Sequence, residues 1–119
     1  MVIRKESAVY VPDRGDVAWI SLNPQVGHEQ SGRRPAVILS PLPYNEKVGL
    51  AICCPVTSAI KGYPWEVVLP DGLPISGAAL SDQVKNLDWR ARGAEKICSL
   101  PQGTVSEILG KLSVLVGKQ

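Results

Sequence analysis

The chain has 119 residues, 45% of them apolar and 20% charged, which predicts one folded domain over residues 1–119 rather than disorder. The formal net charge is only +2, so any cationic surface for nucleic acid has to be local. No stretch approaches the ~20 apolar residues of a membrane span, and the N-terminus lacks the apolar run of a signal peptide. We expect a cytoplasmic protein that does not contact a membrane.

In chain order, a mixed arm over residues 1–12 is followed by a series of short extended segments. The alternation and the apolar runs predict strands over 16–22, 34–40, 48–56, 64–69 and 77–84, with shorter extended pieces at 88–91 and 94–98. The second and third strands are almost wholly apolar, which is typical of strands buried on both faces. Pro41, Pro43 and Asn45 predict a break between them. We expect Trp19 in the core.

The C-terminal segment is different, because its apolar residues recur at helical spacing. Val105, Ile108, Leu109, Leu112, Leu115 and Val116 predict one face of a helix that ends at Gly117. Ser99 with Gln102 and Thr104 with Glu107 are alternative capping boxes for its start. The side chains of Leu112, Leu115 and Val116 could serve the core or an interface. The pattern predicts a mainly β fold: a small, partly closed antiparallel barrel of five to seven strands with an amphipathic C-terminal helix.

The three cysteines, Cys53, Cys54 and Cys98, are an odd number without a CxxC spacing, and the chain has one histidine. This composition predicts buried free thiols in a reducing compartment rather than disulfides or a zinc site. Because Cys53 and Cys54 are adjacent in a strand, their side chains should point to opposite faces.

The sharpest polar cluster runs from Gly27 to Pro35, where a long loop over 23–33 meets a buried strand. Pro35 favours an extended Arg34, and a guanidinium fixed at the mouth of a barrel suits bidentate contact with phosphate. The simpler alternative is a surface ion pair between Glu29 and Arg33 or Arg34. His28 alone is typical of a solvated loop side chain.

Further polar groups lie at the ends of the later strands. Thr57 follows Pro55 and could donate a hydrogen bond to a phosphate oxygen. Gln83 and Lys85 belong to a polar group on an otherwise apolar strand. Arg90 and Arg92 would share a face if their segment is extended, and Trp89 beside them would stack on a base or join the core.

Several chemistries are excluded by the sequence. It contains no GxxxxGK[ST] loop, no GxGxxG, no GxSxG and no cluster of carboxylates for a pair of magnesium ions. We expect no metal and no cofactor. A phosphodiester cut without metal needs an internal nucleophile, which RNA has in its 2′-hydroxyl and DNA lacks, so a nuclease of this kind would act on RNA and not on DNA.

These motifs, in this order, resemble the MazF/PemK/Kid family of type II toxins, and its MazF branch most. The similarity covers about Tyr10 to Gly117 and rests on Arg14-Gly15-Asp16 to Trp19-Ile20, His28-Glu29-Gln30-x-Gly-x-Arg34 to Ser40, Pro55-x-Thr57, Lys61-Gly62-Tyr63-Pro64-Trp65 to Leu69, Asp82-Gln83-Val84-Lys85 and Trp89 to Ala94. The resemblance implies an SH3-like barrel, a homodimer and a cognate MazE-like antitoxin. It also implies an mRNA interferase, an endoribonuclease that cuts single-stranded RNA at short sequences, with an ACA-like triplet as the first sequence to test.

By motif position, the resemblance implies that Arg34 and Thr57 are the central catalytic pair, supported by Glu29. Since guanidinium stays protonated, Arg34 should stabilise charge on the phosphate, and Glu29 or His28 is the better proton acceptor. We expect RNA contacts from the loops 23–33 and 59–63 and from nearby polar side chains. The RNA-binding candidates are His28, Gln30, Arg33, Lys61, Gln83, Lys85, Arg90 and Arg92.

Two alternative functions remain. One is a binding toxin of the CcdB type that acts on DNA gyrase, and the other is a relative that binds RNA or antitoxin without cutting. The presence of Glu29, Arg34 and Thr57 argues against both alternatives.

Overall fold

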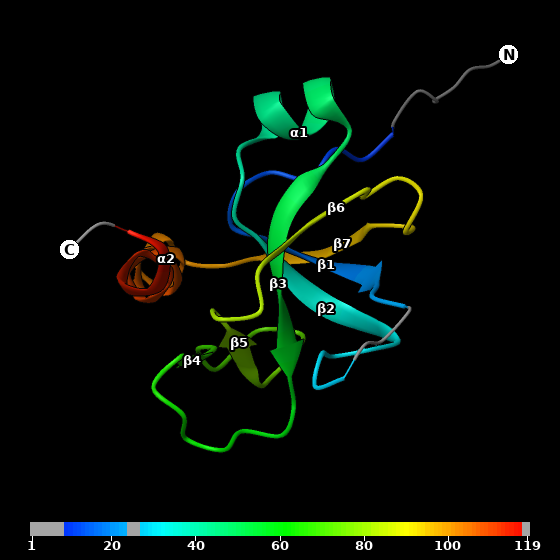
Figure 1. Ribbon diagram of the computed structural model, residues 1–119. Helices are drawn as coiled ribbons and strands as arrows, with labels where there is room; N and C mark the ends of the chain where they lie inside the picture. Colours follow the sequence, from blue (N-terminus) through cyan, green and yellow to red (C-terminus); the bar gives the residue numbers. More distant parts are fainter. Residues whose placement is uncertain (1–8, 24–26, 118–119) are drawn as a thin grey trace, which may run out of the picture.

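The computed structural model describes residues 9–23 and 27–117 and shows a mainly β fold with a helix near the C-terminus (Figure 1). The elements in these ranges are β1 Asp16–Ser21, β2 Arg33–Ile38, α1 Leu42–Val48, β3 Ala51–Thr57, β4 Glu66–Val68, β5 Ala78–Leu80, β6 Lys85–Leu87, β7 Glu95–Ser99 and α2 Gln102–Val116. The predicted fold class, a small antiparallel barrel with a C-terminal helix, is confirmed. No helix in these ranges is long and apolar enough to cross a membrane.

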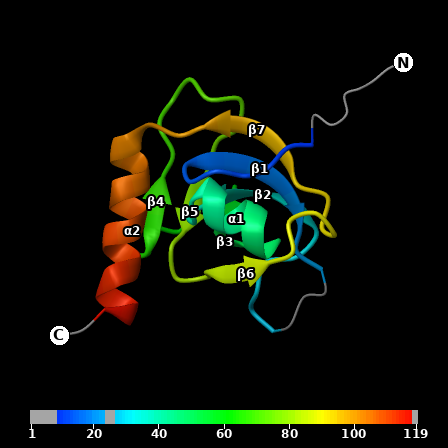
Figure 2. The same cartoon turned by 90° about the horizontal axis from the view of Figure 1, so that it is seen from above.

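The strands form a strongly curved antiparallel sheet in the order β4-β5-β3-β2-β1-β7, and β6 pairs with β3 outside this path. Seen from above in Figure 2, the strands curl around one another, and α2 stands beside β4. The curvature leaves β1, β2 and β3 at the centre of the molecule, which explains the apolar runs in β2 and β3.

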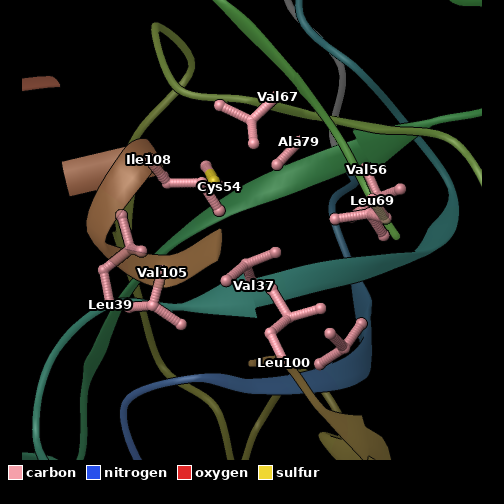
Figure 3. Packing of buried hydrophobic residues seen from close by; sticks show 11 residues of the cluster. Val37, Leu39, Cys54, Val56, Val67, Leu69, Ala79, Leu100, Val105 and Ile108 are labelled. Carbon is pink, nitrogen blue, oxygen red and sulfur yellow. The ribbon is translucent and has the colours of Figure 1, made fainter. Parts of the chain in front are cut away.

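Two apolar clusters lie on opposite faces of these central strands. The first fills the space between the sheet and α2, and Figure 3 shows Val105 and Ile108 of the helix facing Val37 and Cys54 of the strands. The second cluster includes Ile20, Ile38, Cys53 and Trp89. Cys53 and Cys54 therefore belong to different clusters, and the prediction that they are free, buried and oppositely directed is confirmed. Cys98 is also a free thiol, but it is only partly buried, so the predicted burial is wrong for this residue.

The helix α2 begins after Pro101 and has no side-chain cap, so both predicted capping boxes are wrong. Ser99 is instead the last residue of β7. Pro101 suits the position because its φ is already near the helical value and its missing N–H is not needed there. The predicted end at Gly117 is confirmed, with its N–H 2.7 Å from Ser113 O. On the predicted apolar face, Leu112 packs on the core, whereas Leu115 is exposed.

The short helix α1 was not predicted, because its two prolines indicate a break. Both lie at the start of the helix, where the first N–H groups have no intrahelical acceptor and proline is tolerated. The helix is held by the fully buried Asn45, whose Nδ2 donates to Pro12 O at 2.8 Å and to Ser40 O at 2.9 Å. It ends at Gly49, which has a φ of +80°.

Three other predictions are wrong. The strand expected over 77–84 stops at Leu80, and residues 81–82 form a turn. The segment 88–91 is not extended, because residues 89–93 also form a turn. Trp19 is 37% exposed and belongs to neither of the two apolar clusters. The expected arm lies partly outside the described residues; of the rest, Pro12 is buried.

Candidate functional site

The candidate site lies where β2 and β3 part at one end of the barrel. Their ladder ends at the pair Ala36 and Pro55, beyond which β2 continues beside β1 only and β3 pairs with β5. Pro55 has no backbone N–H to donate across the sheet. Figure 1 shows the two strands diverging toward the loops at this end, opposite α1. Arg34 and Thr57 each stand two residues past the last pair, so the sequence places both at the opening.

Arg34 lies on β2 and is held by its backbone and by one side-chain bond. Its strand is extended as Pro35 predicts, and Nε donates to Ser31 O at 2.8 Å. Within the described part of the chain, its two Nη groups have no hydrogen-bond partner. The guanidinium lines an open hollow of about 450 Å³ together with Trp19, Arg33 and Ser58. A half-buried guanidinium with a fixed stem and free donors suits an oxyanion.

Thr57 ends β3 and lines a second hollow, of about 320 Å³, which we call the Thr57 hollow. Its side chain is buried, and Oγ1 accepts the N–H of Ala59 at 3.1 Å, which leaves the hydroxyl proton for another acceptor. The hollow brings together five of the predicted site residues: His28, Gln30, Thr57, Lys61 and Gln83. Thr57 and Arg34 therefore line two hollows that meet at neighbouring residues, because Ser58, which follows Thr57 in the chain, lines the hollow of Arg34.

Two contacts attach the described part of the 23–33 loop to the segment around β6. Glu29 Oε1 lies 2.9 Å from Lys85 Nζ. Glu29 thus forms an ion pair, but with Lys85, and the predicted alternative of an ion pair with Arg33 or Arg34 is wrong. The N–H of Gln30 donates to Gln83 Oε1 at 3.3 Å. Residues that are far apart in the sequence thus fix the loop beside the Thr57 hollow.

Three predicted RNA-binding arginines are engaged elsewhere in the fold. Arg33 Nη2 pairs with Glu95 Oε1 at 2.5 Å and donates to Gly93 O at 2.8 Å. Arg90 stacks on Trp89, with its Cζ 4.8 Å from the ring centroid. Arg92 Nη1 donates to Asn23 O at 2.7 Å and to Ser21 O, both at the start of the loop.

The expectation that Arg90 and Arg92 share an extended face is wrong, because both lie in the turn over 89–93. Trp89 is 2% exposed, and its indole N–H donates to Asn45 O at 2.9 Å. Of the two roles that the sequence leaves open for Trp89, the structure supports the core.

The Thr57 hollow also contains residues that were not among the predicted site residues. They are Trp65, Glu66, Leu80 and Asp82, whereas Ala59 and Tyr63 belong to the loop 59–63, from which RNA contacts were expected without either residue being named. Tyr63 and Trp65 follow Lys61 at alternate positions, a pattern of cation and aromatics that is common in single-strand binding surfaces and could have indicated them. Glu66 gives no such signal, because a glutamate at the start of a strand is ordinary. In the described ranges, no group of three His, Cys, Asp or Glu side chains could hold a metal ion.

The fold and the site define a small antiparallel barrel with a polar, partly cationic opening at the ends of two central strands. Residues 13–116 match the family described as PemK-like, MazF-like toxin of type II toxin-antitoxin system, and the chain belongs to this family. The predicted family membership is thereby confirmed.

Individual relatives agree with the family assignment. The chain is 50% identical over 108 residues to the endoribonuclease toxin MazF of Escherichia coli K12, covering 91% of this chain and 96% of that protein. The crystal structure of MazF from Deinococcus radiodurans superposes with a TM-score of 0.90 at 51% identity, over 92% of this chain and all of the other. A MazE-MazF crystal structure from the same organism has a TM-score of 0.83 at 45% identity, over 93% of this chain and all of the matched chain.

Proposed function

We propose that this protein is an endoribonuclease toxin that cuts single-stranded RNA without a metal ion. The endoribonuclease activity follows from family membership and from the relatives that carry this name. The observation that carries the proposed chemistry is the position of Arg34. Its stem is tied to Ser31 O, and its two Nη groups are left without a partner in the described part of the chain, at the opening beside Thr57.

In the proposed reaction, the 2′-oxygen of the RNA attacks the adjacent phosphorus while the bond from phosphorus to the 5′-oxygen breaks. The products are a 2′,3′-cyclic phosphate and a 5′-hydroxyl end. Arg34 stabilises the charge that develops on the phosphate oxygens, and the Thr57 hydroxyl donates to one of them. Glu29 or His28 accepts the proton of the 2′-hydroxyl, and the leaving 5′-oxygen takes up a proton. DNA is not cut, since it lacks the nucleophile.

The Thr57 hollow is the proposed binding site for nucleotides next to the cut. Lys61 supplies a cation for the backbone, and Tyr63 and Trp65 supply ring faces for stacking. Gln30, Gln83 and His28 offer hydrogen bonds to base edges, so they are proposed to set the sequence that is cut.

We propose that the protein works as a homodimer in the cytoplasm and that a cognate MazE-like antitoxin silences it. The end of α2 offers apolar surface for an interface, since Val114 is 71% and Val116 is 73% exposed. Cutting of mRNA then stops translation and growth until the antitoxin binds the toxin.

The test is to incubate purified, antitoxin-free protein in EDTA with a mixed-sequence single-stranded RNA and a DNA of the same sequence, beside an Arg34→Ala variant. We expect the wild type to cut only the RNA and to leave 5′-hydroxyl ends, and the variant to lose this activity. If folded wild-type protein leaves all RNA sequences intact, the proposal is wrong, and a gyrase assay then separates a CcdB-type toxin from a non-cleaving relative.

A further inference from the structure

The segment over residues 58–65, which we call the Lys61 loop, forms one wall of the Thr57 hollow. It joins β3 to β4 and contributes Ala59, Lys61, Tyr63 and Trp65 to the lining. Apart from Trp65, these side chains are exposed, so packing does little to hold the loop in place. The conformation of the Lys61 loop must therefore depend mainly on contacts of its backbone.

The backbone of the Lys61 loop is bound by the carboxylate of Glu66, the first residue of β4. Glu66 Oε1 accepts the N–H of Gly62 at 2.8 Å and that of Lys61 at 3.1 Å, and Oε2 lies 3.2 Å from the same Lys61 nitrogen. The N–H of Glu66 in turn donates to Tyr63 O at 3.1 Å. These bonds close the loop on itself next to the hollow.

Glu66 is only 8% exposed, and in the described ranges no Lys, Arg or His side chain pairs with it. A buried carboxylate is costly unless hydrogen-bond donors replace its water, and here two loop amides do so. Gly62 makes the arrangement possible, because its φ of +81° is one that other residues rarely adopt. The loop conformation and the burial of this charge thus depend on each other.

We propose that Glu66 is a positioning residue for RNA binding, which acts through the backbone of the Lys61 loop to hold Lys61 and Tyr63 at the hollow. This inference rests on the proposed ribonuclease function. Within residues 9–23 and 27–117, the hydrogen bonds that the Glu66 carboxylate accepts come from the backbone N–H groups of Lys61 and Gly62. Loss of this carboxylate should therefore weaken the binding of substrate and transition state alike. The effect then falls on KM rather than on kcat.

The test compares Glu66→Gln with Glu46→Gln, the same change at an exposed site on α1, at the opposite end of the barrel (Figure 1). For Glu66→Gln we expect KM to rise about tenfold and kcat to stay within about twofold, because the amide replaces a charged acceptor by a neutral one. Glu46→Gln should match the wild type in both constants. A purely stabilising role of Glu66 would lower Tm and leave the KM of the folded enzyme unchanged, and that result overturns the proposal.

A double-mutant cycle with Lys61→Gln then asks whether Glu66 acts through Lys61. We expect the double variant to raise KM by clearly less than the product of the two single effects, since residues that act as one unit are not additive. Independent effects that multiply would contradict the proposal.

Amide hydrogen exchange on the wild-type protein keeps the proposal testable if Glu66→Gln does not fold. The Gly62 amide should exchange more slowly than that of Gly72, a glycine with positive φ in an exposed turn. Equal rates would show that Glu66 does not hold the loop and would overturn the proposal. A wild type that cuts no RNA would instead overturn the proposed function, whatever the exchange rates are.

Discussion

Lys85 Nζ lies 2.9 Å from Glu29 Oε1, and this contact joins the loop after β1 to the first residue of β6. The two residues are far apart in the sequence, and the ion pair forms only because β6 folds back onto β3. The carboxylate that is a candidate proton acceptor is thus oriented by a cation from another part of the chain.

We predict that Lys85→Met lowers kcat about tenfold, because Glu29 loses the ion pair that helps to orient its carboxylate toward the 2′-hydroxyl. The unfolding free energy should change by less than about 1 kcal/mol, since exposed ion pairs contribute little. RNA cleavage kinetics and urea unfolding measure the two effects. Lys47→Met on the exposed face of α1 is the matched control. A wild-type kcat in Lys85→Met would show that the pair does not serve catalysis.

Arg34→Lys keeps the positive charge but loses the bond from Nε to Ser31 O and the planar pair of Nη donors. We predict that kcat falls on the order of 10²–10³-fold, which is typical for loss of a preorganised oxyanion donor. Single-turnover cleavage of a defined RNA measures the change, and circular dichroism verifies the fold. Near wild-type cleavage by the lysine variant would mean that charge alone suffices at this position.

The cysteines should differ in reactivity toward iodoacetamide. Burial raises the pKa of the Cys53 thiol to about 12, which nearby Arg92 and Lys85 only partly offset, and burial also raises the pKa of Cys54. Because the thiolate is the nucleophile, both should stay unmodified at pH 8, while the half-buried Cys98 reacts first. Peptide mass spectrometry of native protein and of protein in guanidinium gives the comparison. Alkylation of Cys53 in native protein would contradict the buried position.

Gly77 packs directly against the end of β3. A Cβ at this position would lie 2.2 Å from Thr57 O, and its φ is +134°. We predict that Gly77→Ala costs about 3 kcal/mol of stability and moves Thr57 enough to reduce cleavage. Gly72→Ala, also at positive φ but with open space around the new carbon, should cost only about 1 kcal/mol and leave cleavage unchanged. Urea unfolding measures both, and equal costs for the two variants would count against the close contact.

Tyr10 gives the protein a pH-dependent contribution to stability. Burial raises the pKa of its hydroxyl, and so does the 2.7 Å hydrogen bond that it donates to Asp16 Oδ2. The unfolded chain releases this proton near pH 10, whereas the folded chain retains it, so the contribution is complete below pH 10 and is lost as the pH rises further.

Tyr10→Phe removes this group, and we predict that it lowers stability by about 1 kcal/mol at pH 8. The difference from the wild type should shrink between pH 10 and 11. Urea unfolding of both proteins across this range is the measurement. A difference in unfolding free energy between the two proteins that grows with pH would contradict the prediction.

The elements that the sequence predicts correctly are those whose pattern is strong over several residues. The apolar runs in β2 and β3 indicate strands buried on both faces, because only such strands lack polar alternation. The spacing of Val105 and Ile108 indicates the buried side of α2. The candidate site at the ends of β2 and β3 was proposed through the family motifs around Arg34 and Thr57, rather than through local physical chemistry.

Other features depended on contacts that no local pattern carries. Trp89 is buried in the second apolar cluster and donates its indole N–H to Asn45 O, whereas Trp19 is partly exposed and lines the open hollow beside Arg34. Arg92 donates to the carbonyl of Asn23, a partner 69 residues away in the sequence.

The sequence by itself therefore determined which segments are buried and which residue types are available for chemistry, because burial follows from the period of apolar side chains. Only the tertiary structure decided the partners of the charged and polar side chains. Glu29 binds Lys85 and Glu66 binds the amides of the Lys61 loop because hydrogen bonds and ion pairs depend on distances of a few ångströms between strands. Such distances are set by how the whole sheet curves, and they are not encoded near either residue.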